Sequence, residues 1–269
     1  MTAPDLSQIK QRQQQTWAAA DYSATGVRLM LVAELLCEAA DLRGGERLLD
    51  VATGAGNVAI AAARRFADAV GVDYVPEVLE RARERAAAER FDIEFCEGDA
   101  EELPFPDGSF DVVTSTFGAM FAPDQPRAAA ELARVCRPGG RVAMANWTPE
   151  GFCGQLFRVV GRHVPPPPGL VPPTCWGTED GVRDLLGPHA DTIAIAERAI
   201  PMRFRSPEHW VAFFRENFGP IRQAFAGLDP AGQAALDRDL LELIGRFNRA
   251  GDGTMLVDGA YLEVVAVRA

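Results

Sequence analysis

A glycine loop and an acid that follows it combine residue types that could bind a nucleoside. A short apolar run leads into Asp50-Val51-Ala52-Thr53-Gly54-Ala55-Gly56-Asn57. Glycines in such a turn let the backbone approach a ligand closely, and the helix expected after them offers free N–H groups. Asp73 ends the next apolar run, where a carboxylate can accept hydrogen bonds from both ribose hydroxyls. A purely structural turn and a helix-capping acid are the alternatives, but the two features together favour nucleoside binding.

The cofactors NAD and S-adenosylmethionine would both fit this loop and acid. The dinucleotide fingerprint Gly-x-Gly-x-x-Gly needs a third glycine, and Ala59 stands at that position, although alanine sometimes replaces it. A third apolar run is followed by Gly98-Asp99-Ala100. There a carboxylate and the next backbone N–H could bind the amine and a ring nitrogen of adenine. These features favour S-adenosylmethionine over NAD.

Short apolar runs alternate with helix-forming stretches from residue 47 onward. Strands are expected at 47–52, 69–73, 93–97, 110–116 and 141–147, and helices at 57–66, 76–90 and 127–136. This alternation with short loops predicts an α/β fold with a doubly wound, mainly parallel sheet. Later helices are expected at 152–164, 178–186, 207–218 and 230–248. Two more strand regions are expected, at 193–204 and 261–267, and the first of them is either one long strand or a pair broken at Pro201. The late strands are compatible with an antiparallel edge.

Five segments, in this order and at this spacing, resemble the motifs of class I S-adenosylmethionine-dependent methyltransferases. They are 48–56 (LLDVATGAG), 71–73 (GVD), 98–105 (GDAEELPF), 110–113 (FDVV) and 132–140 (LARVCRPGG). The chain is most similar to methyltransferase type 11/25 and to the branch that includes the ubiquinone and menaquinone C-methyltransferases. The resemblance covers about residues 45–148. It departs from the family at Ala52, where glycine is common.

This resemblance implies a Rossmann-like methyltransferase fold, with a seven-stranded sheet, an antiparallel edge strand and a helical lid. It divides the chain into an N-terminal helical cap at 1–44, a cofactor-binding core at 45–148, and lid helices with the last strands of the same sheet at 149–269. S-adenosylmethionine is the implied cofactor. The implied activity is methyl transfer to a small-molecule acceptor, at O, N or C. An NAD(P)-dependent oxidoreductase and a non-catalytic S-adenosylmethionine-binding protein are the alternatives.

The family's motifs assign cofactor contacts to residues of this chain. They imply contacts with the methionine part, the ribose, the adenine and the region near the sulfonium. Thr53, Gly54 and Gly56 would contact the methionine part. Asp73 would bind the ribose, with Tyr74 against the adenine or the ribose. Asp99 and Ala100 would bind the adenine, and Ser115, Thr116 and Phe117 would lie near the sulfonium. Asp50 is expected to order the glycine loop. The segment 17–22 (WAAADY) resembles one that folds over the cofactor, so Trp17 or Tyr22 would cover the methionine end; alternatively, both aromatic residues dock their helix on the core.

Methyl transfer from a sulfonium needs alignment and desolvation more than acid–base chemistry. If the acceptor must lose a proton, the candidate bases are His163, Tyr22 and Glu150. Several aromatic residues could line an apolar acceptor pocket or belong to the core. They are Phe117, Phe121, Trp147, Phe152 and Trp176. No metal site is expected, because the three histidines are far apart and no Cys-x-x-Cys occurs.

The composition excludes several other classes of protein. Lys10 is the only lysine, and its polar surroundings are unsuited to lowering its pKa, so an enzyme with a Schiff-base lysine is not expected. The sequence also lacks the Gly-Lys-Ser/Thr of a P-loop and the Tyr-x-x-x-Lys pair of short-chain dehydrogenases. The net charge of −11 argues against a nucleic-acid or anionic-membrane partner. No long apolar run or secretory signal is present, so the five cysteines are expected as reduced thiols in the cytoplasm. We expect a monomer or homodimer with a small-molecule partner.

Overall fold

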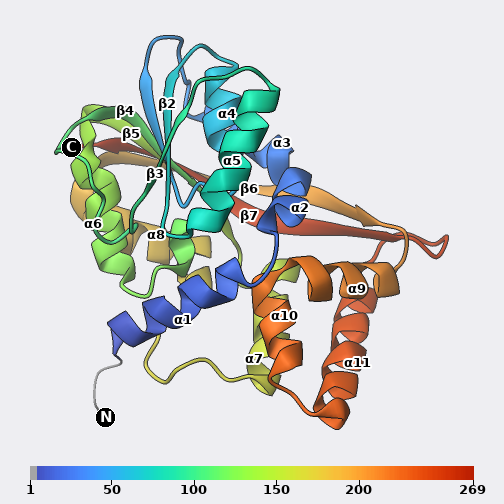
Figure 1. Cartoon of the computed structure of the whole chain (residues 1–269). Coiled ribbons are helices and arrows are strands. Elements are labelled where there is room, and N and C mark those ends of the chain that lie inside the picture. Colours follow the sequence, from blue (N-terminus) through green and yellow to red (C-terminus); the bar gives the residue numbers. More distant parts are fainter. Residues whose placement is uncertain (1–4) are drawn as a thin grey trace.

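Within residues 5–269, which the computed structural model describes, seven strands form one sheet. They are β1 (Arg47–Val51), β2 (Asp68–Asp73), β3 (Glu94–Glu97), β4 (Phe110–Thr116), β5 (Cys136–Trp147), β6 (Ala190–Phe204) and β7 (Met255–Arg268). Their order is β3-β2-β1-β4-β5-β7-β6. β1 to β5 are parallel, whereas β7 is antiparallel to both β5 and β6. The predicted doubly wound, mainly parallel sheet with an antiparallel strand near its edge is confirmed (Figure 1).

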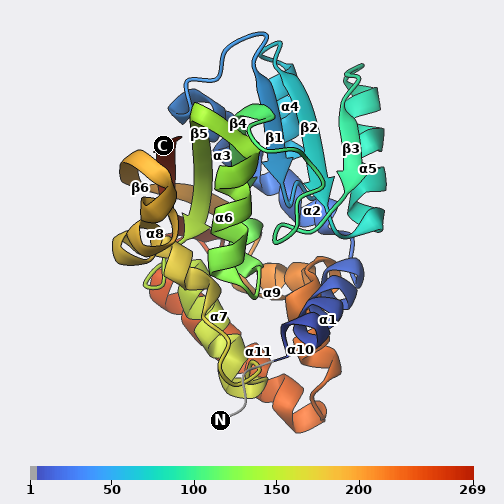
Figure 2. The same cartoon turned by 90° about the vertical axis from the view of Figure 1, so that its left-hand side faces the viewer.

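Helices cover both faces of the sheet. One face carries α3 (Met30–Ala39), α4 (Asn57–Ala63) and α5 (Pro76–Ala88), and the other carries α6 (Gln125–Val135) and α8 (Glu179–Leu186) (Figures 1 and 2). Successive residues of a strand point to opposite faces. Within β1, Leu48 therefore packs with α3 to α5, whereas Leu49 belongs to the core on the other face. Both side chains are fully buried, as expected for parallel strands covered on both faces.

A third group of helices lies beyond the carboxyl ends of the parallel strands. They are α1 (Leu6–Ala18), α7 (Phe152–His163), α9 (Pro207–Asn217), α10 (Gly219–Ala226) and α11 (Pro230–Phe247). Figure 1 shows them as a layer below the sheet. α1 and α10 are in close contact, because a Cβ on Gly219 would lie 2.0 Å from the carbonyl oxygen of Thr16. This contact joins the N-terminal segment to helices that come late in the chain.

Some element bounds differ from the predicted ones. β5 begins at Cys136, directly after α6, and continues through Pro138-Gly139-Gly140, where a break between helix and strand is predicted. Cys136 can join the sheet this early because it pairs with Phe110 of β4. β6 is one strand that runs through Pro201, which an edge strand tolerates because its outer side needs no N–H donor.

No helix is predicted where α10 lies, and no bounds are predicted for α1, α2 (Tyr22–Gly26) and α3 within the helical cap expected at 1–44. Neither α3 nor α10 has a side-chain hydrogen bond at its N-cap, so the capping residue that usually marks a helix start is absent. Pro220, in the first turn of α10, is the one start signal there. No helix of the described chain is sufficiently long and apolar to cross a membrane.

Candidate functional site

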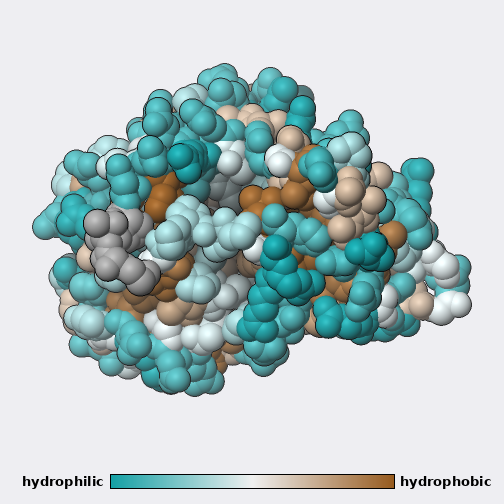
Figure 3. Space-filling model, turned by 90° about the horizontal axis from the view of Figure 1, so that it is seen from below, coloured by the Kyte–Doolittle hydropathy of each residue, from teal (hydrophilic) through white to brown (hydrophobic). Residues whose placement is uncertain are grey.

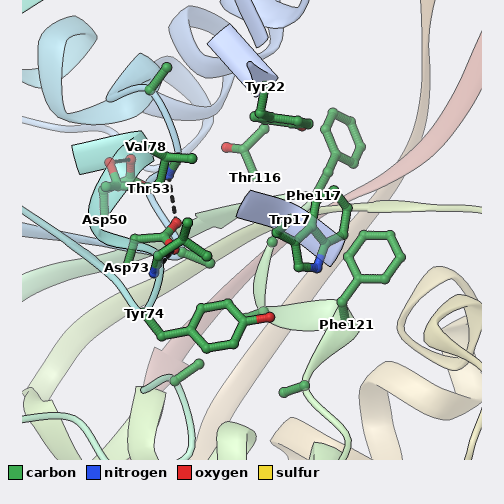
Figure 4. Close-up of a pocket in the computed structure, with 18 of the residues that line it drawn as sticks. Trp17, Tyr22, Asp50, Thr53, Asp73, Tyr74, Val78, Thr116, Phe117 and Phe121 are labelled. Atoms are coloured by element: carbon green, nitrogen blue, oxygen red, sulfur yellow. Dashed lines mark hydrogen bonds between the residues drawn. The ribbon is translucent and has the colours of Figure 1, made fainter. Parts of the chain in front are cut away.

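A cavity opens at the carboxyl ends of β1, β2 and β4 (Figure 4). It contains about 1070 Å³ of space, part of it open to solvent. Its wall combines the glycine loop, the end of β2, the segment after β3, the end of β4 and α1. In Figure 4, Asp50 and Asp73 lie on one side of the cavity, and the rings of Trp17, Tyr22 and Phe121 lie on the other. The cavity therefore has one acidic and one aromatic side.

The glycine loop after β1 is held by hydrogen bonds to a buried acid. Gly54 has a φ of +54°, a region in which residues with a Cβ are strained. The Thr53 hydroxyl donates to Asp50 Oδ2 at 2.6 Å, and the Thr114 hydroxyl donates to Asp50 Oδ1 at 3.2 Å. Burial raises the pKa of Asp50 to about 7, although these hydrogen bonds oppose the rise. Asp50 therefore orders the loop, and it also borders the cavity.

Asp73, at the end of β2, borders the cavity and is oriented by the backbone. Its carboxylate accepts hydrogen bonds from the N–H of Gly54 at 2.9 Å and from the N–H of Val75 at 3.0 Å. Burial raises the pKa of Asp73 to about 6. A carboxylate offers about four acceptor positions, so these two bonds leave capacity for the hydroxyl groups of a ligand. Tyr74 follows Asp73 in the cavity wall.

Ala52, where the family often has glycine, adopts a left-handed backbone with a φ of +53°. The loop after β4 leaves room for its side chain, because residue 118 is glycine. A Cβ on Gly118 would lie 2.5 Å from the Cβ of Ala52, closer than real Cβ contacts allow. Both residues border the cavity. The departure from the family pattern is therefore matched by a glycine on the neighbouring loop.

A cluster of charges lies where α1 meets the segment after β3. Asp99 accepts a hydrogen bond from the N–H of Glu101 at 2.9 Å, and Lys10 Nζ lies 2.5 Å from both Asp99 Oδ2 and Glu101 Oε2. Burial alone would lower the pKa of Lys10, but the hydrogen bonds and charges of the two acids raise it above its ordinary value. The lysine is therefore protonated, as its sequence context predicts, and ties α1 to the acidic segment. Ala100 lies beside Asp99 in the cavity wall.

Aromatic side chains from distant parts of the chain cover the other side of the cavity. The Trp17 ring contacts Tyr22, Phe121 and Phe218 edge-on, with ring centroids 5.8, 5.2 and 5.6 Å apart. The Tyr22 ring lies against the glycine loop, since a Cβ on Gly54 would be 3.5 Å from it. Trp17 and Tyr22 thus border the cavity and also pack against the hydrophobic core, so the geometry is compatible with both alternatives.

A second cavity adjoins the first and contains about 970 Å³, part of it open to solvent. Five side chains border both cavities: Trp17, Tyr22, Leu29, Phe117 and Phe121. The remaining wall is mostly apolar and comes largely from α7, β6 and α9. We call the first cavity the cofactor cavity and the second the acceptor cavity, after the roles proposed for them below.

Three of the five aromatic residues that could build an acceptor pocket do line the second cavity: Phe117, Phe121 and Trp147. The other two, Phe152 and Trp176, are fully buried in the core. The Phe152 ring packs edge-on against the Trp210 ring at 5.6 Å. The alternative that such residues are simply core therefore holds for these two positions.

Two expected cofactor contacts lie outside the lining of the cofactor cavity. Ser115 is fully buried, and its hydroxyl donates to the carbonyl of Val51 at 2.8 Å and accepts from the N–H of Ala119 at 2.9 Å. Gly56 caps the start of α4 with a φ of +80°. Their observed contacts hold the loops that carry the lining residues.

Two of the candidate bases also lie away from both cavities. His163 Nε2 is 2.9 Å from Asp239 Oδ2 and joins α7 to α11. Glu150 is an exposed acid paired with Arg158 at 2.8 Å. Neither His163 nor Glu150 therefore lines either of the two cavities, and no role as a base is proposed for them. Of the three candidates, only Tyr22 borders them.

Some lining residues lie outside the sequence motifs. Lys10 and Gln13 come from α1 and Leu29 from η1 (Val27–Leu29). Gln13 Nε2 donates to the carbonyl of Phe121 at 3.1 Å, which fixes α1 over the cavity. None of these residues belongs to a motif, and the only signal was that Lys10 is the sole lysine. Residues 5–269 contain no group of three or more side chains that could hold a metal ion.

Comparisons with known proteins agree with this geometry. Residues 49–144 match the family model described as a methyltransferase domain. An uncharacterized protein of Mycobacterium tuberculosis is 40% identical over 234 residues, covering 85% of each chain. A demethylmenaquinone methyltransferase of Thermus thermophilus is 38% identical over 161 residues, covering 54% of this chain and 73% of that protein. The fold is also similar to the solved structure of phosphoethanolamine N-methyltransferase 2 of Haemonchus contortus, with a TM-score of 0.52 and 20% identity. The similarity covers 84% of this chain and 49% of that one, whose structure is a complex with phosphomonomethylethanolamine and S-adenosylhomocysteine.

Proposed function

Because this chain belongs to the S-adenosylmethionine-dependent methyltransferase family, we propose that it transfers the methyl group of S-adenosylmethionine to a small-molecule acceptor. The observation that carries the proposal is the pair of adjoining cavities. One is bordered by the glycine loop and by acids, the other mainly by aromatic side chains. Ligands bound in the two cavities would be neighbours, and in-line transfer needs its reactants aligned at short range.

We propose that the cofactor cavity binds S-adenosylmethionine through residues that the structure already orients. Asp73 would accept hydrogen bonds from the ribose, and Tyr74 would lie against the ribose or the adenine. Asp99 and Ala100 would bind the adenine. This assignment is supported by their common position on the wall of one cavity.

The methionine end of the cofactor is assigned to Thr53, Gly54 and Thr116, with Trp17 and Tyr22 as its cover. The Thr116 hydroxyl is buried and has no hydrogen-bond partner within residues 5–269. Because buried polar groups are rarely left without a partner, we propose that this side chain, which borders the cavity, rotates to meet a polar group of the ligand. Acids dominate the charged lining of this cavity, and their negative charge complements a sulfonium cation.

Ser115 and Gly56 are proposed to support cofactor binding indirectly. Each holds a loop that carries a lining residue, Ser115 through its hydrogen bond to Ala119 and Gly56 as the start of α4. No direct contact with the cofactor is proposed for them.

S-adenosylmethionine would supply a methyl group activated by its sulfonium, so the chain itself has to align the acceptor and exclude water. Tyr22 borders both cavities, but burial raises the pKa of its hydroxyl to about 12. At neutral pH this hydroxyl is protonated and suited to donate a hydrogen bond, not to remove a proton. Cys153 is the other weak acid of the acceptor cavity, and burial raises the pKa of its thiol well above the ordinary value. We therefore propose an acceptor whose nucleophile is already ionised or needs no deprotonation.

We further propose that the cap at 1–44 and the helices within 149–269 act as a lid on the core at 45–148. The contacts of Lys10 and Gln13 with the core support this role for α1. A cytoplasmic location is proposed because all five cysteines are free thiols, which suits a reducing compartment. A monomer or homodimer stays a prediction.

Isothermal titration calorimetry with S-adenosylmethionine, S-adenosylhomocysteine and NAD tests the proposed function. We expect both adenosyl ligands to bind, and the Asp73→Asn variant to lose affinity by about tenfold or more, since an amide offers fewer acceptor positions to the ribose. The Asp73→Ala variant should lose at least as much. Asp92→Asn is the matched control, because Asp92 is exposed and lies outside the cavities.

Unchanged affinity in both Asp73 variants would remove the ribose assignment. Binding of NAD without binding of S-adenosylmethionine would favour the oxidoreductase alternative. Cofactor binding without methyl transfer to any member of a broad acceptor panel would favour a non-catalytic binding protein.

A further inference from the structure

The two cavities differ in the charges of their linings. Asp50, Asp73, Asp99 and a single lysine border the cofactor cavity. The acceptor cavity is lined by two arginines and, among the described residues, by no Asp or Glu. The chain as a whole has a net charge of −11. The positive charge of the acceptor cavity is therefore a local feature that the composition does not explain.

Arg28, in η1, is held at the acceptor cavity by aromatic rings and a carbonyl. Its guanidinium carbon lies 4.2 Å from the ring centroid of Phe213 and 5.8 Å from that of Phe204. One of its N–H groups donates to the carbonyl of Ala24. No carboxylate of residues 5–269 forms an ion pair with it, and residues 1–4 contain no acid. The guanidinium is thus positioned, cationic and without a counter-charge.

Arg203, in β6, is the second arginine that lines the acceptor cavity. Its one hydrogen bond within the described chain is to the carbonyl of Pro201, at 3.4 Å. Arg198, earlier in the same strand, shows the ordinary arrangement instead, since it pairs with Glu263 at 3.1 Å. The acceptor cavity is therefore lined by two arginines that have no ion-pair partner within residues 5–269.

The rest of the acceptor cavity is suited to rings. Phe117 and Trp147 are stacked with centroids 3.6 Å apart and an interplanar angle of 3°, and Phe157, Phe214 and Phe218 also line the wall. Figure 3, which views the molecule from the side of the helical layer, shows hydrophobic surface in recesses that hydrophilic side chains surround. Aromatic walls of this kind favour flat apolar ligands through offset and edge contacts.

We propose that the acceptor is a ring-containing organic acid whose anionic group binds Arg28 and Arg203. This inference rests on the proposed methyltransferase function. The apolar rings of the acceptor occupy the aromatic part of the cavity, while the acidic group lies at the mouth. An arginine guanidinium presents a planar fork of donors that matches the oxygens of a carboxylate or sulfonate. Both arginines are exposed whereas Phe117 and Trp147 are buried, so the anion avoids the large cost of complete desolvation.

Two fluorescent dyes with the same rings test the inference. Anilinonaphthalene sulfonate carries an anionic group, and N-phenylnaphthylamine lacks it. We expect the wild-type protein, saturated with S-adenosylhomocysteine, to bind the sulfonate more tightly than the neutral dye by about tenfold. In Arg28→Gln/Arg203→Gln this preference is expected to disappear, with the affinity for the neutral dye changed by less than about twofold. Each single variant should lose part of the preference.

Arg246→Gln is the matched control, because Arg246 is exposed on α11 and lies outside both cavities. It should retain the full preference. Equal affinity for the two dyes, no binding of either dye, or a preference that survives in the double variant would each overturn the inference. Calorimetry with S-adenosylhomocysteine on the same samples separates the two proposals. If the cofactor product binds but the dyes show no preference, only the acceptor class is refuted; if it does not bind, the methyltransferase proposal itself fails.

Discussion

Replacing Asp50 by asparagine should change how the stability of this protein depends on pH. The Asp50 carboxyl is 2% exposed, and its pKa rises from 3.8 to about 7 on folding because burial disfavours the charged form. Between these two values the folded chain binds more protons than the unfolded chain, so the free energy of unfolding falls as the pH rises. Above pH 7 the ionised carboxylate lowers stability by up to about 4 kcal/mol. Asparagine has the same shape and does not titrate in this range.

The hydrogen bonds of Asp50 decide whether the amide can replace the acid. Its two side-chain partners are the hydroxyls of Thr53 and Thr114, and a hydroxyl can donate or accept. The backbone N–H of Ala59, which also stabilises the carboxylate, can donate to the amide oxygen as well. One hydroxyl can therefore donate to the amide oxygen while the other accepts from the amide nitrogen. We expect Asp50→Asn to match the wild type in stability at pH 4, and to be more stable by about 2–4 kcal/mol at pH 8. Asp50→Ala should be less stable than Asp50→Asn at every pH, because it leaves two buried hydroxyls without this partner.

Urea unfolding followed by tryptophan fluorescence, at several pH values between 4 and 8, measures these differences. Asp92→Asn serves as the control, and the difference between this exposed variant and the wild type should stay nearly constant with pH. A difference between Asp50→Asn and the wild type that is the same at pH 4 and pH 8 would refute the reasoning. It would mean that Asp50 is ionised in the folded protein throughout this range.

Three further predictions concern the walls of the cofactor cavity. Lys10→Gln should weaken the contact of α1 with Asp99. We expect it to lower the affinity for S-adenosylhomocysteine by about three- to tenfold in calorimetry and to speed cleavage of α1 in limited proteolysis. If the affinity and the cleavage rate are both unchanged, α1 is held by its other contacts. Gly118→Ala should reduce the free energy of unfolding by about 2 kcal/mol, because its Cβ would lie 2.5 Å from that of Ala52. Ala52→Gly in the same chain should restore part of this loss, and a failure to do so would assign the clash to the backbone instead. Tyr22→Phe keeps the ring against the glycine loop and should bind S-adenosylhomocysteine within about threefold of the wild-type affinity. Tyr22→Ala should bind it more weakly. Equal affinities of the two variants would show that the ring does not cover the bound ligand.

Local signals were sufficient for the elements of the parallel sheet. Residues 110–116 were predicted as a strand and form β4 with the same bounds, because an apolar run that is buried on both faces stands between glycines. The Thr178 cap of α8 was also predictable, and its hydroxyl accepts a hydrogen bond from the N–H of Gly181 at 3.0 Å. In both cases the signal and the structure lie within a few residues of each other.

Contacts between distant segments explain what the sequence did not reveal. Lys10 meets Asp99 only because α1 crosses the ends of the strands, and the acceptor cavity combines η1, α7, β6 and α9. His163 was a reasonable candidate base by residue type alone. Its helix, however, directs the side chain toward Asp239 of α11, and no local pattern shows which neighbour a helix face will contact.

The backbone at Phe117 shows that the junction of the two cavities is maintained at a cost in stability. Phe117 has a φ of +56°, and a residue other than glycine in this region is destabilised by about 1–3 kcal/mol. Several contacts hold it there: its N–H donates to the carbonyl of Ala145 at 2.9 Å, and its ring stacks on Trp147 and meets Tyr261 edge-on at 5.6 Å. Glycine at this position would relieve the backbone but remove a ring that borders both cavities. The strained residue therefore lies where a cofactor and an acceptor would meet, and its strain is balanced by the same stacking that shapes the acceptor cavity.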